Sequence, residues 1–224
     1  MLEDFLNEYH TGPISILDES ISLLNYTPLD LSSENKEVAK YEITTPEGCQ
    51  QYIDTILKRE GKKVAFGGYL ERRDIYNSFG RFDEGEQRNI HLGMDFWHKS
   101  GTEVIVPIKG KVHSFKNNND MGNYGPTIIL EHHVESFSFY TLYGHLSVES
   151  LQGLEKGKVF QKGEILATLG TPDINVNYAP HLHFQIIKDI QGNEGDYPGV
   201  CSQTELDFYK INCPNPNLLF KLKI

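Results

Sequence analysis

Residues 101–115 read Gly-Thr-Glu-Val-Ile-Val-Pro-Ile-Lys-Gly-Lys-Val-His-Ser-Phe and contain two short β-type runs, 104–108 and 111–115. Branched and aromatic side chains favour strands, and the glycine between the runs is typical of a turn. Further runs of this kind, separated by Gly, Asn and Pro, lie at 127–131, 137–142, 164–169 and 182–187. The pattern predicts a mainly β domain of antiparallel strands with some helix, an α+β composition.

The segment before this β-rich region favours helices. Apolar residues at helical spacing begin the chain, namely Leu2, Phe5, Leu6 and Tyr9. Thr45 is a plausible N-cap, Pro46 suits a first turn and Gly61 suits a C-terminal stop. We therefore expect a helical extension over 1–60 and a β-rich domain over 61–190. The remaining residues, 191–224, are rich in Gly and Pro and are expected to form an irregular tail packed on that domain.

Composition excludes several classes of function. The chain has 21 Lys plus Arg against 31 Asp plus Glu, a net charge of −10, and we find no dense basic stretch that would bind nucleic acid. No apolar run approaches the roughly 20 residues of a membrane-spanning helix. The first ten residues lack the features of a secretory signal, so we expect a cytoplasmic protein. Removal of a signal, or non-classical export, would instead place it in the periplasm or outside the cell.

The three cysteines, Cys49, Cys201 and Cys213, are odd in number and form no Cys-x-x-Cys pair. They predict neither a thiolate zinc site nor a disulfide framework, and we interpret them as buried or incidental thiols.

Three short motifs hold histidines in contexts that suggest chemistry. The first is His91-Leu-Gly-Met-Asp95, and the second is Tyr143-Gly-His145-Leu-Ser147. The third, His181-Leu-His183, lies at the start of a predicted strand, where alternate side chains share a face and Cα atoms two apart lie roughly 6.5–7 Å from each other. Imidazole nitrogens and a carboxylate oxygen suit Zn²⁺.

Each motif alone has a plainer interpretation. A His-x-His pair in a strand is more often structural, and His145 beside Gly144 could be a turn residue. Spacing does not tell which histidine of the last pair would bind a metal. The remaining histidines have no ligand-like context and are interpreted as surface or structural residues: His10, His98, His113, His132 and His133.

Taken together and in this order, the three motifs resemble the lysostaphin-type zinc peptidases, the M23 or LytM family, over about residues 88–188. Two intervening stretches, 101–112 and 156–170, are also similar to that family. The resemblance implies a lysostaphin-type β-sandwich domain with one Zn²⁺ per chain, bound by His91, Asp95 and His183. It also implies that His145 and His181 are the catalytic histidines that do not bind the metal.

The implied activity is peptide hydrolysis through a zinc-activated water. No His-Glu-x-x-His motif supplies a glutamate base, so His145 and His181 are expected to act as base and oxyanion donor. Active family members often carry a tyrosine shortly before the first ligand, whereas residues 82–90 contain none, and Arg88 is a candidate substitute. The stretch 171–180 also departs from the family's small, Gly-rich pattern.

These features leave three hypotheses for function. The first is a peptidase that cleaves peptidoglycan or related peptides. The second is a cytoplasmic zinc hydrolase of a small amide or peptide, because segments around 90–95 and 124–145 look closest to M23-like domains inside large bacterial proteins. The third is a regulatory domain that binds zinc without catalysis, although such members typically lose metal ligands.

Overall fold

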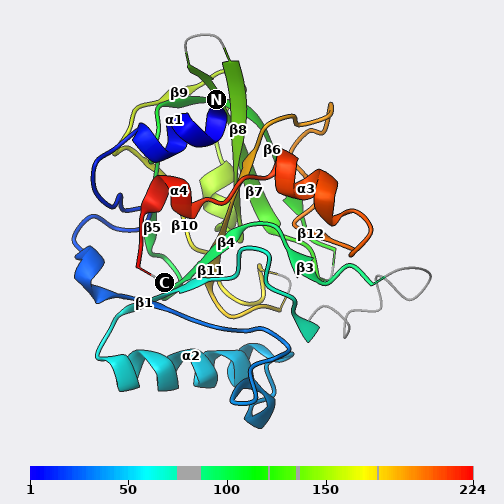
Figure 1. The fold of residues 1–224 in the computed structure, drawn as a ribbon. Coiled ribbons are helices and arrows are strands. Elements are labelled where there is room, and N and C mark those ends of the chain that lie inside the picture. Colours follow the sequence, from blue (N-terminus) through cyan, green and yellow to red (C-terminus); the bar gives the residue numbers. More distant parts are fainter. Residues whose placement is uncertain (75–86, 121, 135–136, 176, 224) are drawn as a thin grey trace.

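The protein is mainly β, as the sequence predicts. The computed structural model describes residues 1–74, 87–120, 122–134, 137–175 and 177–223. In these residues one sheet has the strand order β1-β2-β4-β11-β8-β7-β6-β9, and two small sheets pair β10 with β5 and β12 with β3 (Figure 1). The large sheet comprises β1 (Tyr26–Pro28), β2 (Val64–Gly67), β4 (Met94–Trp97), β6 (Gly110–Asn118), β7 (Gly125–Val134), β8 (Phe137–Gly144), β9 (Val159–Phe160) and β11 (His181–Ile187). The small sheets comprise β3 (Ile90–His91), β5 (Glu103–Ile105), β10 (Ile165–Thr168) and β12 (Val200–Cys201).

Each of the six β-type runs in the sequence overlaps a strand, and the strand pairs are antiparallel with one exception among the described residues. β1 and β2 are parallel, with Tyr26 opposite Val64. Helix α2 (Pro46–Glu60) lies between them in the chain, and parallel neighbours require such a crossover connection. The first part of the chain therefore contributes an edge strand to the sheet as well as helices.

Helix α2 begins and ends where the sequence predicts. The Thr45 hydroxyl accepts a hydrogen bond from the backbone N–H of Gly48 at 3.0 Å, and Pro46 occupies the first turn. Gly61 closes the helix in the left-handed conformation, with φ 64°. The helix packs against the β2 side of the sheet through Tyr52 and Ile53, which share a buried cluster with Trp97.

The two ends of the chain meet on the large sheet. Helix α1 (Leu2–Glu8) contacts α4 (Asn217–Phe220), and Figure 1 shows the two side by side, on the far side of the sheet from α2. The tail after Ile190 is less irregular than expected, because it forms α4, α3 (Leu206–Asn212) and β12. These short elements are stabilised by burial of Tyr209, Leu219 and Phe220 rather than by strong local preferences.

Strand β11 separates two environments. Leu182, Phe184 and Ile186 point into the main core, where Phe184 packs against the Phe220 ring at 5.0 Å. The alternate residues of the strand, His181 and His183, are also buried but face the opposite side. The strand thus presents its histidines to a region outside the main apolar core.

No helix in the described part of the chain is long and apolar enough to cross a membrane. The division of the chain at residues 60 and 190 stays a prediction.

Candidate metal centre

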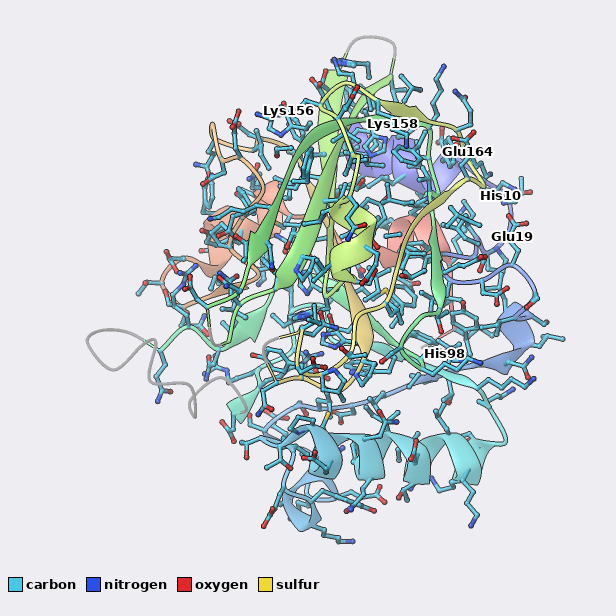
Figure 2. All side chains as sticks on the ribbon, turned by 180° about the vertical axis from the view of Figure 1, so that it is seen from behind. His10, Glu19, His98, Lys156, Lys158 and Glu164 are labelled. Carbon is cyan, nitrogen blue, oxygen red and sulfur yellow. The ribbon has the colours of Figure 1, made fainter. Side chains whose placement is uncertain are left out.

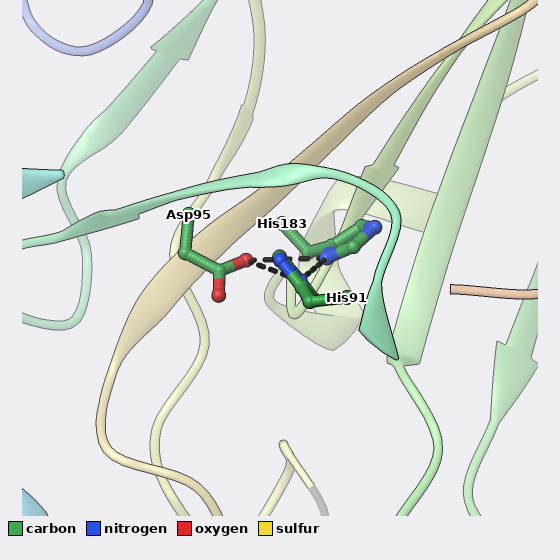
Figure 3. A group of neighbouring side chains, drawn as sticks. All are labelled: His91, Asp95 and His183. Carbon is green, nitrogen blue, oxygen red and sulfur yellow. Dashed lines mark hydrogen bonds and ion pairs between the residues drawn. The ribbon is translucent and has the colours of Figure 1, made fainter. Parts of the chain in front are cut away.

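Three side chains from three strands converge at one point (Figure 3). His91 ends β3, Asp95 lies on β4 and His183 lies on β11. Strands β4 and β11 are antiparallel neighbours, and Asp95 is the direct register partner of His183. Side chains of direct partners lie on the same face of a sheet, so this pairing brings the carboxylate to the ring.

The converging atoms are the Nε2 atom of His91, the Oδ1 atom of Asp95 and the Nδ1 atom of His183. The two ring nitrogens are 2.9 Å apart, and Oδ1 lies 3.3 Å from the His91 nitrogen and 3.1 Å from the His183 nitrogen. All three residues are 1–2% exposed. Two nitrogens and one oxygen within this distance of one another form a group that could hold a metal ion.

Gly93 allows the first motif to fold back onto the last. A Cβ atom at this position would lie 2.5 Å from Cε1 and 2.6 Å from Nε2 of the His183 ring. Any larger residue would push the ring away, because such contacts are shorter than van der Waals distances. The glycine inside His-x-Gly-x-Asp is therefore required by packing.

A second layer of contacts orients the three side chains. The Nδ1 atom of His91 is 2.8 Å from the carbonyl oxygen of Gly68, and the Nε2 atom of His183 is 3.0 Å from Oε1 of Gln185. The Nη1 atom of Arg73 donates to Oδ2 of Asp95 at 2.6 Å. Each ring thus has an acceptor for its outer nitrogen, which is the arrangement that fixes the orientation of metal-binding histidines.

The electrostatic environment favours a neutral His91 ring beside a charged carboxylate. Burial lowers the pKa of His91 to about 4. Burial alone would raise the pKa of Asp95, but the contacts from His91 and the positive charge of Arg73 outweigh this effect and hold the pKa well below its usual range. These are the protonation states that metal ligands need.

His145 and His181 lie beside this group. Their ring centroids are 4.1 Å apart, and the residues are 5% and 6% exposed. His145 follows the end of β8 and has φ 62°, a conformation that is unusual for a residue other than glycine. Backbone hydrogen bonds to Tyr124 and Gly170 hold it there, at 2.8 and 3.1 Å. Strained backbone of this kind is common at functional sites.

Burial also sets the charge of these two rings. It lowers the pKa of His145 well below its ordinary value, and neighbouring histidines, His181 first, lower it further. Burial likewise lowers the pKa of His181. Both rings are therefore neutral near pH 7, and the Nδ1 atom of His145 is buried without a hydrogen-bond partner among the described residues.

All five side chains line one cavity of about 320 Å³. Several other parts of the chain contribute to its wall: Leu31 and Cys49 from the first 60 residues, Arg73, Arg88 and Trp97, the 122–124 loop, Tyr178 and Ala179 before β11, and tail residues 193 and 196–200. Burial raises the pKa of Cys49 to about 12, so its thiol is a neutral part of the wall. The three cysteines are buried thiols outside any disulfide bond, as the sequence predicts.

Tyr124 and Tyr178 are two aromatic residues of the cavity wall. The Tyr124 ring lies 5.0 Å from that of His183, and its hydroxyl donates to the carbonyl oxygen of Tyr197 at 3.0 Å. The ring of Tyr178 lies 5.4 Å from His145. Tyr124 is thus both a packing residue and a part of the cavity wall.

Arg88 lines the same cavity, and its Nη2 atom donates to the carbonyl oxygen of Val200 at 2.8 Å. Its suggested role in place of a tyrosine stays a prediction, and residues 82–86 of the segment considered with it lie outside the described residues.

The remaining histidines lie outside the group of five. His132 is buried between the Lys109 carbonyl and the Thr141 hydroxyl, while His133 is exposed. Figure 2 shows His10 at an outer edge of the molecule.

The residues of this group fit a metal ion. Ligands about 2.0–2.2 Å from a tetrahedral ion lie roughly 3.3–3.6 Å from one another, so the three atoms would need to separate by about half an ångström or less. The orphaned Nδ1 atom of His145 is a further polar group beside them. The fold and this group together define a β-rich domain with a buried His-Asp-His centre able to hold a metal.

The model of Peptidase family M23 matches residues 89–196, a stretch that contains all five of these residues. This match confirms the resemblance of the motifs to that family over this stretch of the chain. A curated relative from Haemophilus influenzae, described as an uncharacterized metalloprotease, is 37% identical over 95 residues, which is 42% of this chain and 18% of that protein. The chain thus spans less than a fifth of the length of that relative.

Two solved structures are also similar to part of this chain. The catalytic domain of lysostaphin from Staphylococcus simulans is 23% identical over 59% of this chain and 88% of that domain, with a TM-score of 0.37. A zinc containing peptidase from Vibrio cholerae is 27% identical over 44% of this chain and 27% of that chain, with a TM-score of 0.36.

Sequence reasoning missed the second layer of contacts. Gln185 could have been found, because it lies two residues after His183 on a strand and must share its face. Arg73 and Gly68 carried no such signal, because they reach the centre only through the folded chain.

Proposed function

We propose that the chain is a zinc-dependent metallopeptidase that hydrolyses peptide bonds of peptidoglycan or of related peptides. His91, Asp95 and His183 are the proposed ligands of one Zn²⁺ per chain, and His145 and His181 are the proposed catalytic histidines. Convergence of three ligand atoms, beside two neutral imidazoles in the same cavity, supports this proposal most directly. Two nitrogens and one oxygen suit zinc, although the same set of ligands can also bind other divalent ions.

When bound, zinc would polarise the scissile carbonyl and lower the pKa of a water to about 7. The residues of the chain would then handle the proton and the developing charge. His145 is neutral and has a buried, unpartnered Nδ1 atom, so it is suited to accept a proton. The Nδ1 atom of His181 is 2.7 Å from the Ala179 carbonyl, which favours a proton on Nδ1 and leaves Nε2 for the cavity. Once protonated, Nε2 could donate to an oxyanion.

The first test is mass spectrometry of products after incubation of the zinc-loaded protein with purified peptidoglycan and with short cross-bridge peptides. His145→Ala is the control, and a chelator is the second control. Metal-dependent cleavage that is absent from His145→Ala would establish the peptidase and identify the bond. Absence of cleavage by a protein with one bound zinc would contradict the catalytic proposal and favour a regulatory domain.

The cavity supports a second candidate, a hydrolase of a small peptide or amide. The five central residues are at most 6% exposed, and Leu31 and Cys49 line the same cavity. A volume of about 320 Å³ is at the small end for ligand pockets, which run from roughly 300 to 1,000 Å³. Cleavage of short peptides with no cleavage of intact peptidoglycan would favour this candidate over the first.

A further inference from the structure

The two oxygens of the Asp95 carboxylate have different partners. Oδ1 faces the ring nitrogens of His91 and His183, whereas Oδ2 accepts a hydrogen bond from Nη1 of Arg73 at 2.6 Å. The Arg73 side chain is 5% exposed and that of Asp95 is 1% exposed. Solvent therefore cannot readily replace this ion pair, and the outward oxygen of the carboxylate is already occupied.

Arg73 is itself held from several sides. Its Nε atom donates to Oε2 of Glu71, and its guanidinium carbon lies 5.7 Å from the centroid of the Trp97 ring. It also packs closely on Gly68, where a Cβ atom would lie 2.0 Å from Nη2. The planar fork of an arginine can make such contacts to two carboxylates at once, whereas a lysine has a single nitrogen.

Glu71 connects this pair to the N-terminal extension. Its Oε1 atom accepts a hydrogen bond from the backbone N–H of Leu31 at 3.0 Å, while its other oxygen contacts Arg73. A continuous path of hydrogen bonds therefore runs from the Leu31 backbone through Glu71 and Arg73 to Asp95. The extension contributes Leu31 to the cavity wall as well.

We propose that Arg73, held by Glu71, is a positioning residue that restricts Asp95 to one ligand oxygen of the metal centre. This inference rests on the proposed metal centre at His91, Asp95 and His183. Occupation of Oδ2 prevents the carboxylate from turning both oxygens toward the ion. When a metal is bound, the position that a second oxygen would take would then be open for water, which a catalytic zinc site needs.

The positive charge of Arg73 has an opposite effect, because it repels a nearby cation. Its charge is shared between two carboxylates, Glu71 and Asp95, so the three side chains together carry a net negative charge. We therefore expect that the orientation of Asp95 by Arg73 raises metal affinity more than the repulsion of the cation by Arg73 lowers it. Outer contacts of this kind typically change metal affinity by about 10–100-fold.

The test is a titration of the metal-free full chain with cobalt(II), followed by visible absorption. The band positions and intensities report the number and arrangement of ligands, and the titration measures affinity. We would compare the wild type with Arg73→Gln, Arg73→Lys and Glu71→Gln. The matched control is Arg72→Gln, since Arg72 is the exposed neighbour that contacts Gln203 instead of the centre.

We expect Arg73→Gln to shift the cobalt spectrum and to weaken binding by about 10–100-fold. Arg73→Lys should have a spectrum and an affinity between those of Arg73→Gln and the wild type. Glu71→Gln should shift the spectrum and weaken binding in the same direction as Arg73→Gln, by a smaller amount. Arg72→Gln should match the wild type. Circular dichroism of the metal-free variants would identify any that fail to fold. If the Arg73 variants do not fold, Glu71→Gln provides the test, because it retains the arginine.

Two results would overturn the inference: an unchanged spectrum and affinity in a folded Arg73→Gln, or tighter cobalt binding by that variant. The second would mean that repulsion exceeds orientation. A wild-type chain that binds no cobalt would instead contradict the proposed metal centre, so the two failures are distinguishable.

Discussion

Asp95 and His183 are direct cross-strand partners on β4 and β11, and their facing atoms, Oδ1 and Nδ1, are 3.1 Å apart. His183→Ala removes one of the three proposed ligand atoms from this pair. We expect the purified variant to retain well under one zinc per chain after dialysis, because the two remaining ligands cannot hold the ion in competition with water and buffer. Elemental analysis by mass spectrometry checks this, and a full zinc complement in His183→Ala would exclude that residue as a ligand.

His145→Ala should behave in the opposite way. His145 lies beside the group but contributes none of its three converging atoms, so the variant should bind zinc as the wild type does. We expect its turnover to fall by about 10²–10⁴-fold, the usual contribution of a general base or acid. Steady-state kinetics on a cleaved peptide, with the zinc content measured in the same sample, tests the assignment. Loss of the metal would count against it.

Gly93→Ala should disturb the centre by steric contact. The added Cβ atom would lie 2.5 Å from the His183 ring, and overpacking of this kind costs about 1–3 kcal/mol. We expect a lower free energy of unfolding and weaker zinc binding than in the wild type. Gly12→Ala is the matched control, because a Cβ atom there meets nothing within 4 Å. Equal stability of the two variants would show that the ring can move away without cost.

His132 should make stability depend on pH. Burial lowers its pKa from 6.5 to about 4, and its ring is fixed by Lys109 and Thr141. Between pH 6.5 and pH 4 the His132 ring is protonated in the unfolded chain but stays neutral in the folded chain. The free energy of unfolding therefore falls as the pH drops from 6.5 toward 4, and His132 does not change it above pH 6.5. The full contribution is on the order of 3 kcal/mol.

Urea unfolding at pH 7.5 and pH 5 would measure this dependence in the wild type and in His132→Gln. The glutamine can keep a polar contact but does not titrate, so its loss of stability at low pH should be smaller. An equal loss in both proteins would assign the pH dependence to other groups.

Local sequence determined several features of the structure. The N-cap Thr45 and the left-handed Gly61 bound helix α2, because a cap and a stop depend on a few neighbouring residues. The runs that became β7 and β11 also follow from their own composition. Side chains two residues apart on a strand share a face, so the sequence alone places His181 and His183 on one face of β11.

The local pattern did not predict α3, α4 or the parallel pairing of β1 with β2. These short elements depend on partners far away in the chain, as when α4 packs on α1. A helix of four residues has almost no stability of its own. Its existence is decided by burial of Leu219 and Phe220 in the main core.

The sequence by itself supplied the candidate ligands, because the motifs that contain His91, Asp95 and His183 resemble those of a known family, although spacing did not distinguish His181 from His183. Only the tertiary structure decided how they are oriented. Register pairs Asp95 with His183, and Arg73 reaches the same carboxylate from 22 positions earlier in the chain. Ligand type is a local chemical property, whereas orientation depends on contacts between distant segments that exist only after the sheet and the N-terminal extension have packed together.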